Sequence, residues 1–150
     1  MTKRIHLILA LACILAACTK KESESSSATE NIAQPVSECY AYTTDKDSAF
    51  LHIEMTADNI VTGELEYSIF EKDKNRGKIE GKINGDTLRA DYQFMSEGVA
   101  STREVVFIKK DGNWVEGFGP VDEKDGGMRF SDRSKLDFTN GLTFRNAKCR

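Results

Sequence analysis

The stretch Asn84-Gly85-Asp86-Thr87-Leu88-Arg89-Ala90-Asp91-Tyr92-Gln93-Phe94 indicates the fold class of this chain. After the Asn-Gly-Asp triplet, every second residue is apolar: Leu88, Ala90, Tyr92 and Phe94. Polar or charged residues occupy the positions between them. Such an alternation is typical of a β-strand with one buried face and one face in water. The triplet itself is typical of a tight hairpin between two antiparallel strands.

The same pattern continues in both directions along the chain. Alternating or apolar runs predict further strands over residues 49–56, 60–70, 79–83, 99–110 and 114–118. Glycine-containing turns at Ser96-Glu97-Gly98 and Asp111-Gly112 separate the later ones.

The C-terminal third is predicted to hold a loop and one more hairpin. Residues 122–127 are polar and end in glycine, which favours a loop. Leu136 and Phe138 are expected to pair with Leu142 and Phe144 across Asn140-Gly141. We therefore predict an all-β domain of about eight strands, either a small antiparallel up-and-down β-barrel or a strongly curved sheet, because closure removes most sheet edges.

The N-terminus has the features of an export signal. Lys3 and Arg4 precede an apolar run over residues 5–15, which is too short for a membrane span of about 20 residues but suits a signal peptide. The run ends at Leu15-Ala16-Ala17-Cys18, which resembles the lipobox of bacterial lipoproteins. The resemblance implies cleavage after residue 17 and attachment of a diacylglycerol to Cys18. The acyl chains would then hold the protein on a bilayer.

The residues after Cys18 are predicted to form a spacer. Ser, Glu and Lys dominate residues 19–36, which leaves almost nothing to bury and favours a disordered tether. The expected organisation is a signal peptide at 1–17, the lipidated cysteine and tether at 18–36, and the β domain at 37–150. Loss of Lys3 and Arg4 with the signal peptide changes the formal net charge from −3 to −5, which argues against nucleic acid as a partner.

Two cysteines remain for the domain once Cys13 is removed and Cys18 carries lipid. Cys39 and Cys149 lie near its two ends, and an even pair in an exported protein favours a disulfide. The alternative is a redox-active thiol pair, which the sequence supports less because no Cys-x-x-Cys spacing is present.

One strand departs from the alternation. In residues 99–110, Arg103 shares its parity with Val105 and Phe107, while Glu104 shares its parity with Val106 and Ile108. A β-bulge could reset the register, or one charge could point inward. The simpler interpretation leaves both charges in water at the strand's end. The functional alternative places Arg103 or Glu104 at the mouth of a β cup, near Tyr92 and Phe94, where it would orient the polar end of a ligand.

The residue inventory favours a protein without catalytic machinery. Only His52 would remain after export, so a multi-histidine metal site is excluded, and we predict no metal, no cofactor and no catalytic residues. Neither a nucleophile elbow nor a phosphate-binding glycine loop is present. Trp114, the single tryptophan, is expected in the core rather than on a binding surface.

Two further resemblances concern the domain itself. Gly85-Asp86-Thr87-Leu88, Tyr92-Gln93-Phe94 and Ser96-Glu97-Gly98 resemble segments of small lipoproteins of Bacteroidota that have no known activity. The arrangement of a lipoprotein barrel with cysteines near both ends is similar to that of periplasmic inhibitors of c-type lysozyme, although their Ser-Gly-x-x-Tyr loop is missing here.

The sequence thus predicts a lipoprotein of the bacterial cell envelope, periplasmic or surface-exposed, with the outer membrane favoured as its location. We expect a non-enzymatic interaction module of unknown partner, for which a protein and a small apolar ligand are the candidates. The alternatives are a barrel that carries a small apolar ligand and an inhibitor of a lysozyme-type hydrolase.

Overall fold

The computed structural model describes residues 34–150. The expected signal peptide, the lipidation site Cys18 and most of the expected tether lie outside the described residues.

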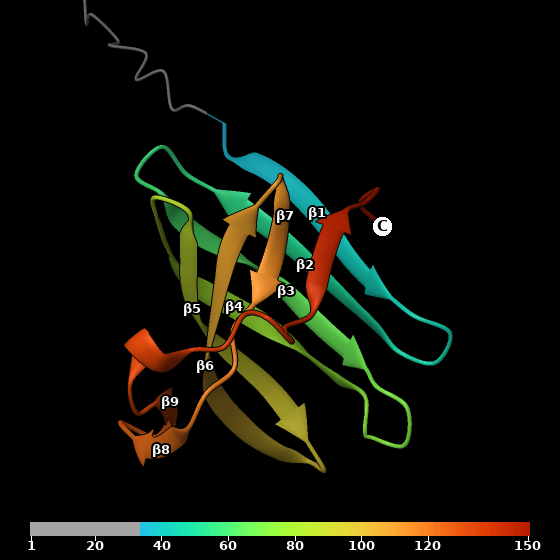
Figure 1. Cartoon of the computed structure of the whole chain (residues 1–150), viewed down its shortest axis with the longest axis vertical. Coiled ribbons are helices and arrows are strands. Elements are labelled where there is room, and N and C mark those ends of the chain that lie inside the picture. The colour runs from blue at the N-terminus through green and yellow to red at the C-terminus, as the bar shows by residue number, and fades with distance from the viewer. Residues whose placement is uncertain (1–33) are drawn as a thin grey trace, which may run out of the picture. The chain divides into compact units, whose positions relative to one another are not determined.

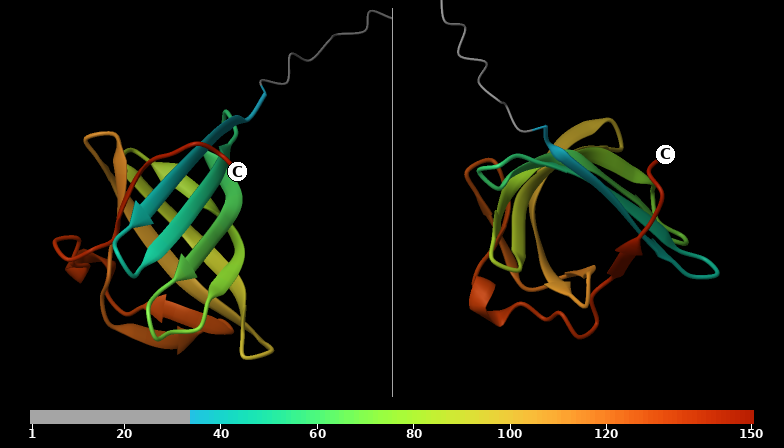
Figure 2. Two further views of the ribbon diagram at one scale, coloured as in Figure 1. Left: turned by 90° about the vertical axis from the view of Figure 1, so that its right-hand side faces the viewer. Right: turned by 90° about the horizontal axis from the view of Figure 1, so that it is seen from above.

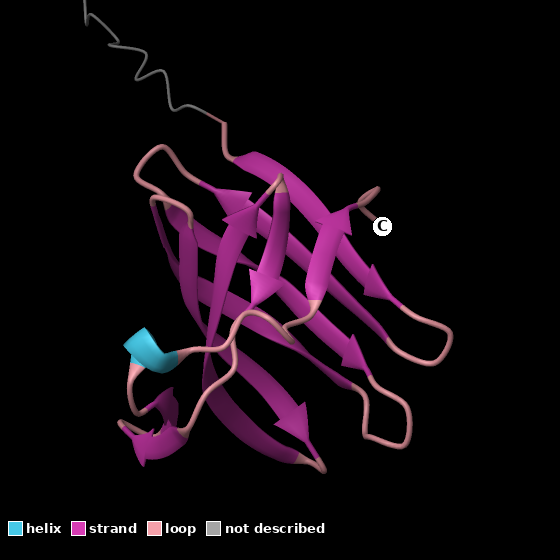
Figure 3. Ribbon diagram, in the orientation of Figure 1, coloured by secondary structure: helices cyan, strands magenta, loops and turns pink. Residues whose placement is uncertain are grey.

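Residues 34–150 form an all-β domain (Figures 1 and 3). Its strands, in chain order, are β1 (Val36–Thr43), β2 (Ser48–Met55), β3 (Ile60–Ser68), β4 (Asn75–Asn84), β5 (Thr87–Ser96), β6 (Val99–Lys110), β7 (Asn113–Glu116), β8 (Val121–Lys124), β9 (Gly127–Phe130) and β10 (Thr143–Asn146). One short 3-10 helix, η1 (Arg133–Lys135), follows β9. No helix among these residues is long or apolar enough to cross a bilayer.

Eight of the strands close into an antiparallel barrel, as the sequence predicted. Strands β1 to β5 pair in sequence order, β6 returns to pair with β5, and the ring is completed through β7 and β10 back to β1. The ring is visible from above in the right panel of Figure 2. Strands β8 and β9 form a hairpin outside this ring, and β9 attaches to β6 by a parallel pairing of Met128 with Arg103.

The long strands keep a regular register, which fixes the face of each side chain. Strand β5 pairs with β6 without interruption from Thr87–Ile108 to Ser96–Val99, so β6 contains no bulge. The hairpin turns at Glu97-Gly98 and Asp111-Gly112 have positive φ at both residues, as tight two-residue turns require.

Tight coiling of the sheet depends on glycines on its inner face. A Cβ at Gly77 would lie 2.0 Å from the carbonyl oxygen of Gln93, and one at Gly63 would lie 1.9 Å from that of His52. The neighbouring strands therefore approach more closely than any side chain allows, which lets a short sheet bend into a closed barrel.

Inward-facing side chains fill the barrel. Leu51, Val61, Leu65, Leu88 and Phe107 have no exposed surface. Aromatic pairs bring side chains of different strands together inside, with Phe107 packed edge-on against Phe144 at 5.6 Å and Tyr40 against Trp114 at 6.5 Å. Trp114 is 1 % exposed, which confirms its expected place in the core.

The disulfide prediction is confirmed. Cys39 in β1 is bonded to Cys149 just beyond β10, with their Cα atoms 5.2 Å apart. The bond covers the outer face of the barrel and ties the C-terminal segment to the first strand.

Two expectations for the C-terminal third were wrong. Residues 121–130 form the β8–β9 hairpin around Asp125-Gly126 rather than a loop. Asn140-Gly141 does not join a hairpin, because the residues on either side of it have other partners. Asp137 pairs with Phe118, and the strand that holds Phe144 pairs with both β1 and β7.

Candidate functional site

The two charges that break the alternation of β6 lie on opposite faces of the barrel wall. Arg103 points inward and its side chain remains 39 % exposed at one end of the barrel. Glu104 points outward, yet it is only 4 % exposed because residues 129–133 cover it. The expectation that both charges lie in water was therefore wrong, and a bulge is not the cause of the irregular pattern.

Aromatic rings surround the Arg103 guanidinium. Its central carbon lies 5.1 Å from the ring centre of Tyr67, 5.5 Å from that of Tyr92 and 5.8 Å from that of Phe94. Tyr92 and Phe94 are stacked on each other at 4.6 Å. The faces of these rings attract the cation.

Glu116 also lies inside the barrel, and its carboxylate faces the Arg103 guanidinium. One of its carboxylate oxygens, Oε1, accepts a hydrogen bond of 2.7 Å from the Tyr67 hydroxyl and is 3.9 Å from Nη2 of Arg103. Strands β3 and β7 stand on opposite sides of the ring, so the Tyr67–Glu116 hydrogen bond crosses the barrel. It therefore forms a floor beneath Arg103.

Burial dominates the electrostatics of this carboxylate. It raises the pKa of Glu116 from 4.5 to about 7, although the Tyr67 hydroxyl and the Arg103 charge both act to lower it. Burial likewise raises the pKa of Tyr67 far above its usual value. Glu116 is thus poised to change its charge close to neutral pH.

Unpartnered polar atoms gather at the same end of the barrel. Tyr92 Oη, Arg103 Nε, Glu116 Oε2 and Asn75 Oδ1 are buried without a hydrogen-bond partner among residues 34–150. Asn75 pairs with Tyr67 across β3 and β4, which places it on the inner face as well. We call the group of inward residues at this end the Arg103 mouth, and its members are Tyr67, Asn75, Tyr92, Arg103 and Glu116. Buried polar atoms are nearly always satisfied in native proteins, so these four atoms make this end of the barrel the candidate site.

The other end of the barrel also holds a cation beside an aromatic ring and a carboxylate, but more of the polar atoms there have partners. Lys109 Nζ lies 5.1 Å from the ring centre of Trp114 and 3.7 Å from Glu38 Oε2, and the Tyr40 hydroxyl donates to the same glutamate oxygen at 2.6 Å. Both charged side chains are about one-third exposed, so water can reach them. Only Trp114 Nε1 is left buried without a partner at this end among the described residues.

Glu104 has a structural task rather than a ligand-binding one. Its carboxylate accepts hydrogen bonds from Arg133 Nε at 2.7 Å and from the Phe130 backbone N–H at 3.1 Å, and Arg89 Nε is 3.8 Å away. A second pair, Arg129 with Asp91, fixes β9 to the outer face of β5. Glu104 therefore clamps the segment between β7 and β10 to the barrel wall.

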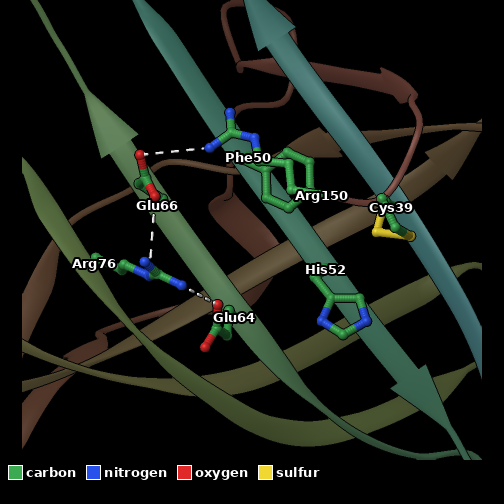
Figure 4. Close-up of a pocket in the computed structure, with 8 residues that line it drawn as sticks. Cys39, Phe50, His52, Glu64, Glu66, Arg76 and Arg150 are labelled. Carbon is green, nitrogen blue, oxygen red and sulfur yellow. Dashed lines mark hydrogen bonds and ion pairs between the residues drawn. A yellow bond between two sulfur atoms is a disulfide. The ribbon is translucent and has the colours of Figure 1, made fainter.

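The outer face of β2 to β4 carries a hollow of about 250 Å³ beside the disulfide (Figure 4). Its charges are already paired with one another. Arg76 donates to Glu64 at 2.7 Å, while Arg150 lies 3.8 Å from Glu66 and over the Phe50 ring at 4.3 Å. His52 borders this hollow far from the mouth and contacts Ser37 at 3.0 Å. Because these groups satisfy one another, the hollow is a weaker candidate than the Arg103 mouth.

A larger hollow of about 540 Å³ lies between the outer wall and residues 133–138. Val106, Ile108, Leu136 and Phe138 contribute apolar surface to it. The nearby cations Arg89 and Arg133 are both engaged by Glu104, so this hollow follows from the way the segment is clamped to the wall.

Sequence reasoning identified Arg103 but missed Glu116, Asn75 and Tyr67 as its companions. These three come from strands β7, β4 and β3, and only closure of the barrel brings them to one end. A signal for Glu116 was present, because it shares its parity with the core residue Trp114. No three side chains of the His, Cys, Asp or Glu types converge in a metal-binding arrangement among residues 34–150.

No family model, no curated protein and no solved structure matches the chain, so the chemistry of the Arg103 mouth has to be read from its own residues.

Proposed function

We propose that this protein is a membrane-anchored, non-enzymatic binding module of the bacterial cell envelope, and that the Arg103 mouth is its binding site. The observation that carries the second half of this proposal is the group of buried polar atoms without partners around a half-exposed arginine.

The rest of the barrel supports a shallow site at this position. The interior beyond the Tyr67–Glu116 hydrogen bond is occupied by fully buried apolar side chains such as Leu65 and Phe107. A ligand would therefore rest at the mouth and not inside the barrel. The packed interior gives no support to a carrier that encloses an apolar ligand, and nothing in the mouth favours an inhibitor of lysozyme.

The chemistry of the mouth favours binding over catalysis. It holds a single carboxylate, Glu116, and no histidine. General acid–base catalysis most often relies on a histidine or on carboxylates within reach of the substrate. His52 lies on the outer face of β2 and does not belong to the mouth.

The direction of β1 suits an N-terminal anchor. Val36 pairs with Met55 at the end of the barrel away from the mouth, and Thr43 pairs with Ser48 near it. Ser48 pairs in turn with Ser68, next to Tyr67. Strand β1 therefore begins at the end of the barrel opposite to Arg103.

Nuclear magnetic resonance of the full chain in detergent micelles can test this assignment. A set of small fragments that includes carboxylates, amines and neutral aromatics is titrated against the isotope-labelled protein. We expect fragments that bind to shift the resonances of Tyr67, Tyr92, Arg103 and Glu116. Shifts confined to the outer hollow around Arg76 and Arg150, or no shifts at the mouth with any fragment, would refute it.

A further inference from the structure

The free hydrogen-bonding capacity of Arg103 indicates the class of ligand. Among residues 34–150 its buried Nε–H has no hydrogen-bond acceptor, and Nη2 is 3.9 Å from Glu116 Oε1, a distance that makes an ion pair but is too long for a hydrogen bond. The guanidinium presents five N–H donors in a plane, and the rings of Tyr67, Tyr92 and Phe94 surround it. A carboxylate is the planar partner that takes two of these donors at once.

The surroundings of the arginine limit the size of such a ligand. The Tyr67–Glu116 hydrogen bond closes the barrel below Arg103. Apolar side chains at this end are only partly buried, and they are Tyr42, Ile69, Phe94 and Leu142. This rim can cover a few apolar atoms next to the carboxylate, whereas a long chain would find no room in the packed interior.

From this geometry, and resting on the proposed function, we propose that the Arg103 mouth binds a carboxylate on a short apolar stem. The carboxylate of this ligand forms the hydrogen-bonded pair with Arg103 that Glu116 does not form. The carboxyl-terminal residue of a peptide and a short acyl carboxylate both present this chemistry.

A second carboxylate beside Glu116 couples binding to a proton. Two carboxylates on one arginine repel each other unless one is neutral. Burial already brings the pKa of Glu116 to about 7, and the groups that face it are Tyr67 on β3, Tyr92 on β5 and Arg103 on β6. If only the chain with protonated Glu116 binds, affinity should fall about tenfold between pH 6 and pH 8.

The test uses isothermal titration calorimetry on the full chain in detergent micelles with three probes. They are N-acetylphenylalanine, its neutral amide, and hexanoate. We expect the acid to bind at least ten times more tightly than the amide, since the amide cannot form the charged bidentate pair. Tighter binding of N-acetylphenylalanine than of hexanoate would identify a peptide terminus as the source of the carboxylate, and the reverse would identify an acyl chain.

Variants separate the roles of the two charged residues. Arg103→Met should abolish binding of the acid, and Arg103→Lys should weaken it because the fork of donors is lost. Glu116→Gln should retain binding and remove its pH dependence. Arg145→Met, an exposed change on β10, is the matched control and should leave binding unchanged. Trp114 fluorescence checks that each variant keeps its core.

Two results would overturn the inference. One is equal affinity for the acid and the amide, and the other is acid binding that persists in Arg103→Met with the core intact. Either result, combined with fragment shifts at the mouth, would leave the Arg103 mouth as a binding site for a different class of ligand. If none of the three probes binds, the inference is likewise overturned, and the proposed function falls with it only when the fragment titration also shows no shift at the mouth.

Discussion

At the scale of single residues, Glu116 is a carboxylate buried inside the barrel with few partners for its charge. Glu116 is only 3 % exposed in its side chain, and its two neighbours, Tyr67 and Arg103, compensate its charge incompletely. Proteins accept such a costly arrangement where a site needs it, and a group that titrates near neutral pH is characteristic of functional sites.

The buried carboxylate should make the stability of the barrel depend on pH. The pKa of Glu116 is about 7 in the folded chain and 4.5 in the unfolded one, so the folded state holds a proton between these values. The stabilisation from this proton is complete below pH 4.5 and is lost as the pH rises through about 7. From the difference in pKa, the loss should be about 3 kcal/mol.

Urea unfolding of the wild type and of Glu116→Gln between pH 4.5 and pH 8 measures this effect. We expect the free energy of unfolding of the wild type to fall relative to the variant across this range. Glu80→Gln, an exposed change on β4, serves as the control and should follow the wild type. Parallel pH curves for wild type and Glu116→Gln would contradict the prediction.

Of these residues, only Arg103 could be predicted from the sequence, and the reason is physical. Arg103 shares its parity with Val105 and Phe107 in a long strand, and this parity alone made it conspicuous. Glu116 ends a strand of four residues, where a charge is ordinarily read as the beginning of a loop. Its burial comes from Tyr67, which lies 49 residues earlier and reaches it only across the closed barrel.

At the scale of elements, the segment between β7 and β10 is held to the wall by charge. Glu104 accepts two hydrogen bonds from this segment, and Asp91 accepts a hydrogen bond from Arg129. Each hydrogen bond to a charged group contributes about 1.5–3 kcal/mol. Residues 121–130 therefore form a unit whose opening is controlled mainly by polar contacts with β5 and β6.

Neutralising Glu104 should loosen this unit and leave the barrel closed. In Glu104→Gln, amide hydrogens of residues 121–130 are expected to exchange faster with solvent, because the charged acceptor of Arg133 and Phe130 is lost. Hydrogen exchange read by mass spectrometry resolves the segment from the barrel strands. Glu123→Gln, on exposed β8, is the control. A uniform increase across β1 to β6 would show that Glu104 supports the whole barrel instead.

Local turn chemistry predicted hairpins well only where nothing competed for the flanking residues. Gly85-Asp86 and Asp111-Gly112 join strands that pair directly with each other, as expected. Around Asn140-Gly141 the flanking residues are taken by other partners, and the Asp137 side chain accepts from the Thr139 backbone N–H and from Asn140. Turn signals describe local preference, and long-range pairing overrides them.

The disulfide should account for a substantial part of the stability. It joins residues separated by 110 positions, so it removes much of the freedom of the unfolded chain. Replacing Cys39 and Cys149 together by alanine should lower the free energy of unfolding by about 2–5 kcal/mol. Urea unfolding under non-reducing conditions measures this loss, and an unchanged midpoint would contradict it.

At the scale of the whole molecule, the barrel followed from alternation and turns spread along the entire chain. A consistent alternation of apolar and polar residues is compatible with few folds, and a closed barrel of eight strands is one of them. The placement of β10 between β1 and β7 could not be read from the sequence, because it depends on which strand edges remain free after the others have paired.

The proposed lipid anchor belongs to this scale as well, because it would determine where the barrel is held. Residues 15–18 predict a lipid on Cys18, so Cys18→Ser should move the protein from the membrane fraction to the soluble fraction. Mass spectrometry of the wild type should find a mature chain that begins at an acylated cysteine. Continued membrane attachment of Cys18→Ser would contradict the lipoprotein assignment.

The bond between Cys39 and Cys149 closes residues 39–149 into a covalent ring. A single cut in any loop between these cysteines opens the ring but separates nothing, since both pieces stay joined through sulfur. A cut before Cys39 has the opposite effect and releases the whole ring at once. The first cleavage of this molecule should thus either give fragments that separate only after reduction or release an intact domain.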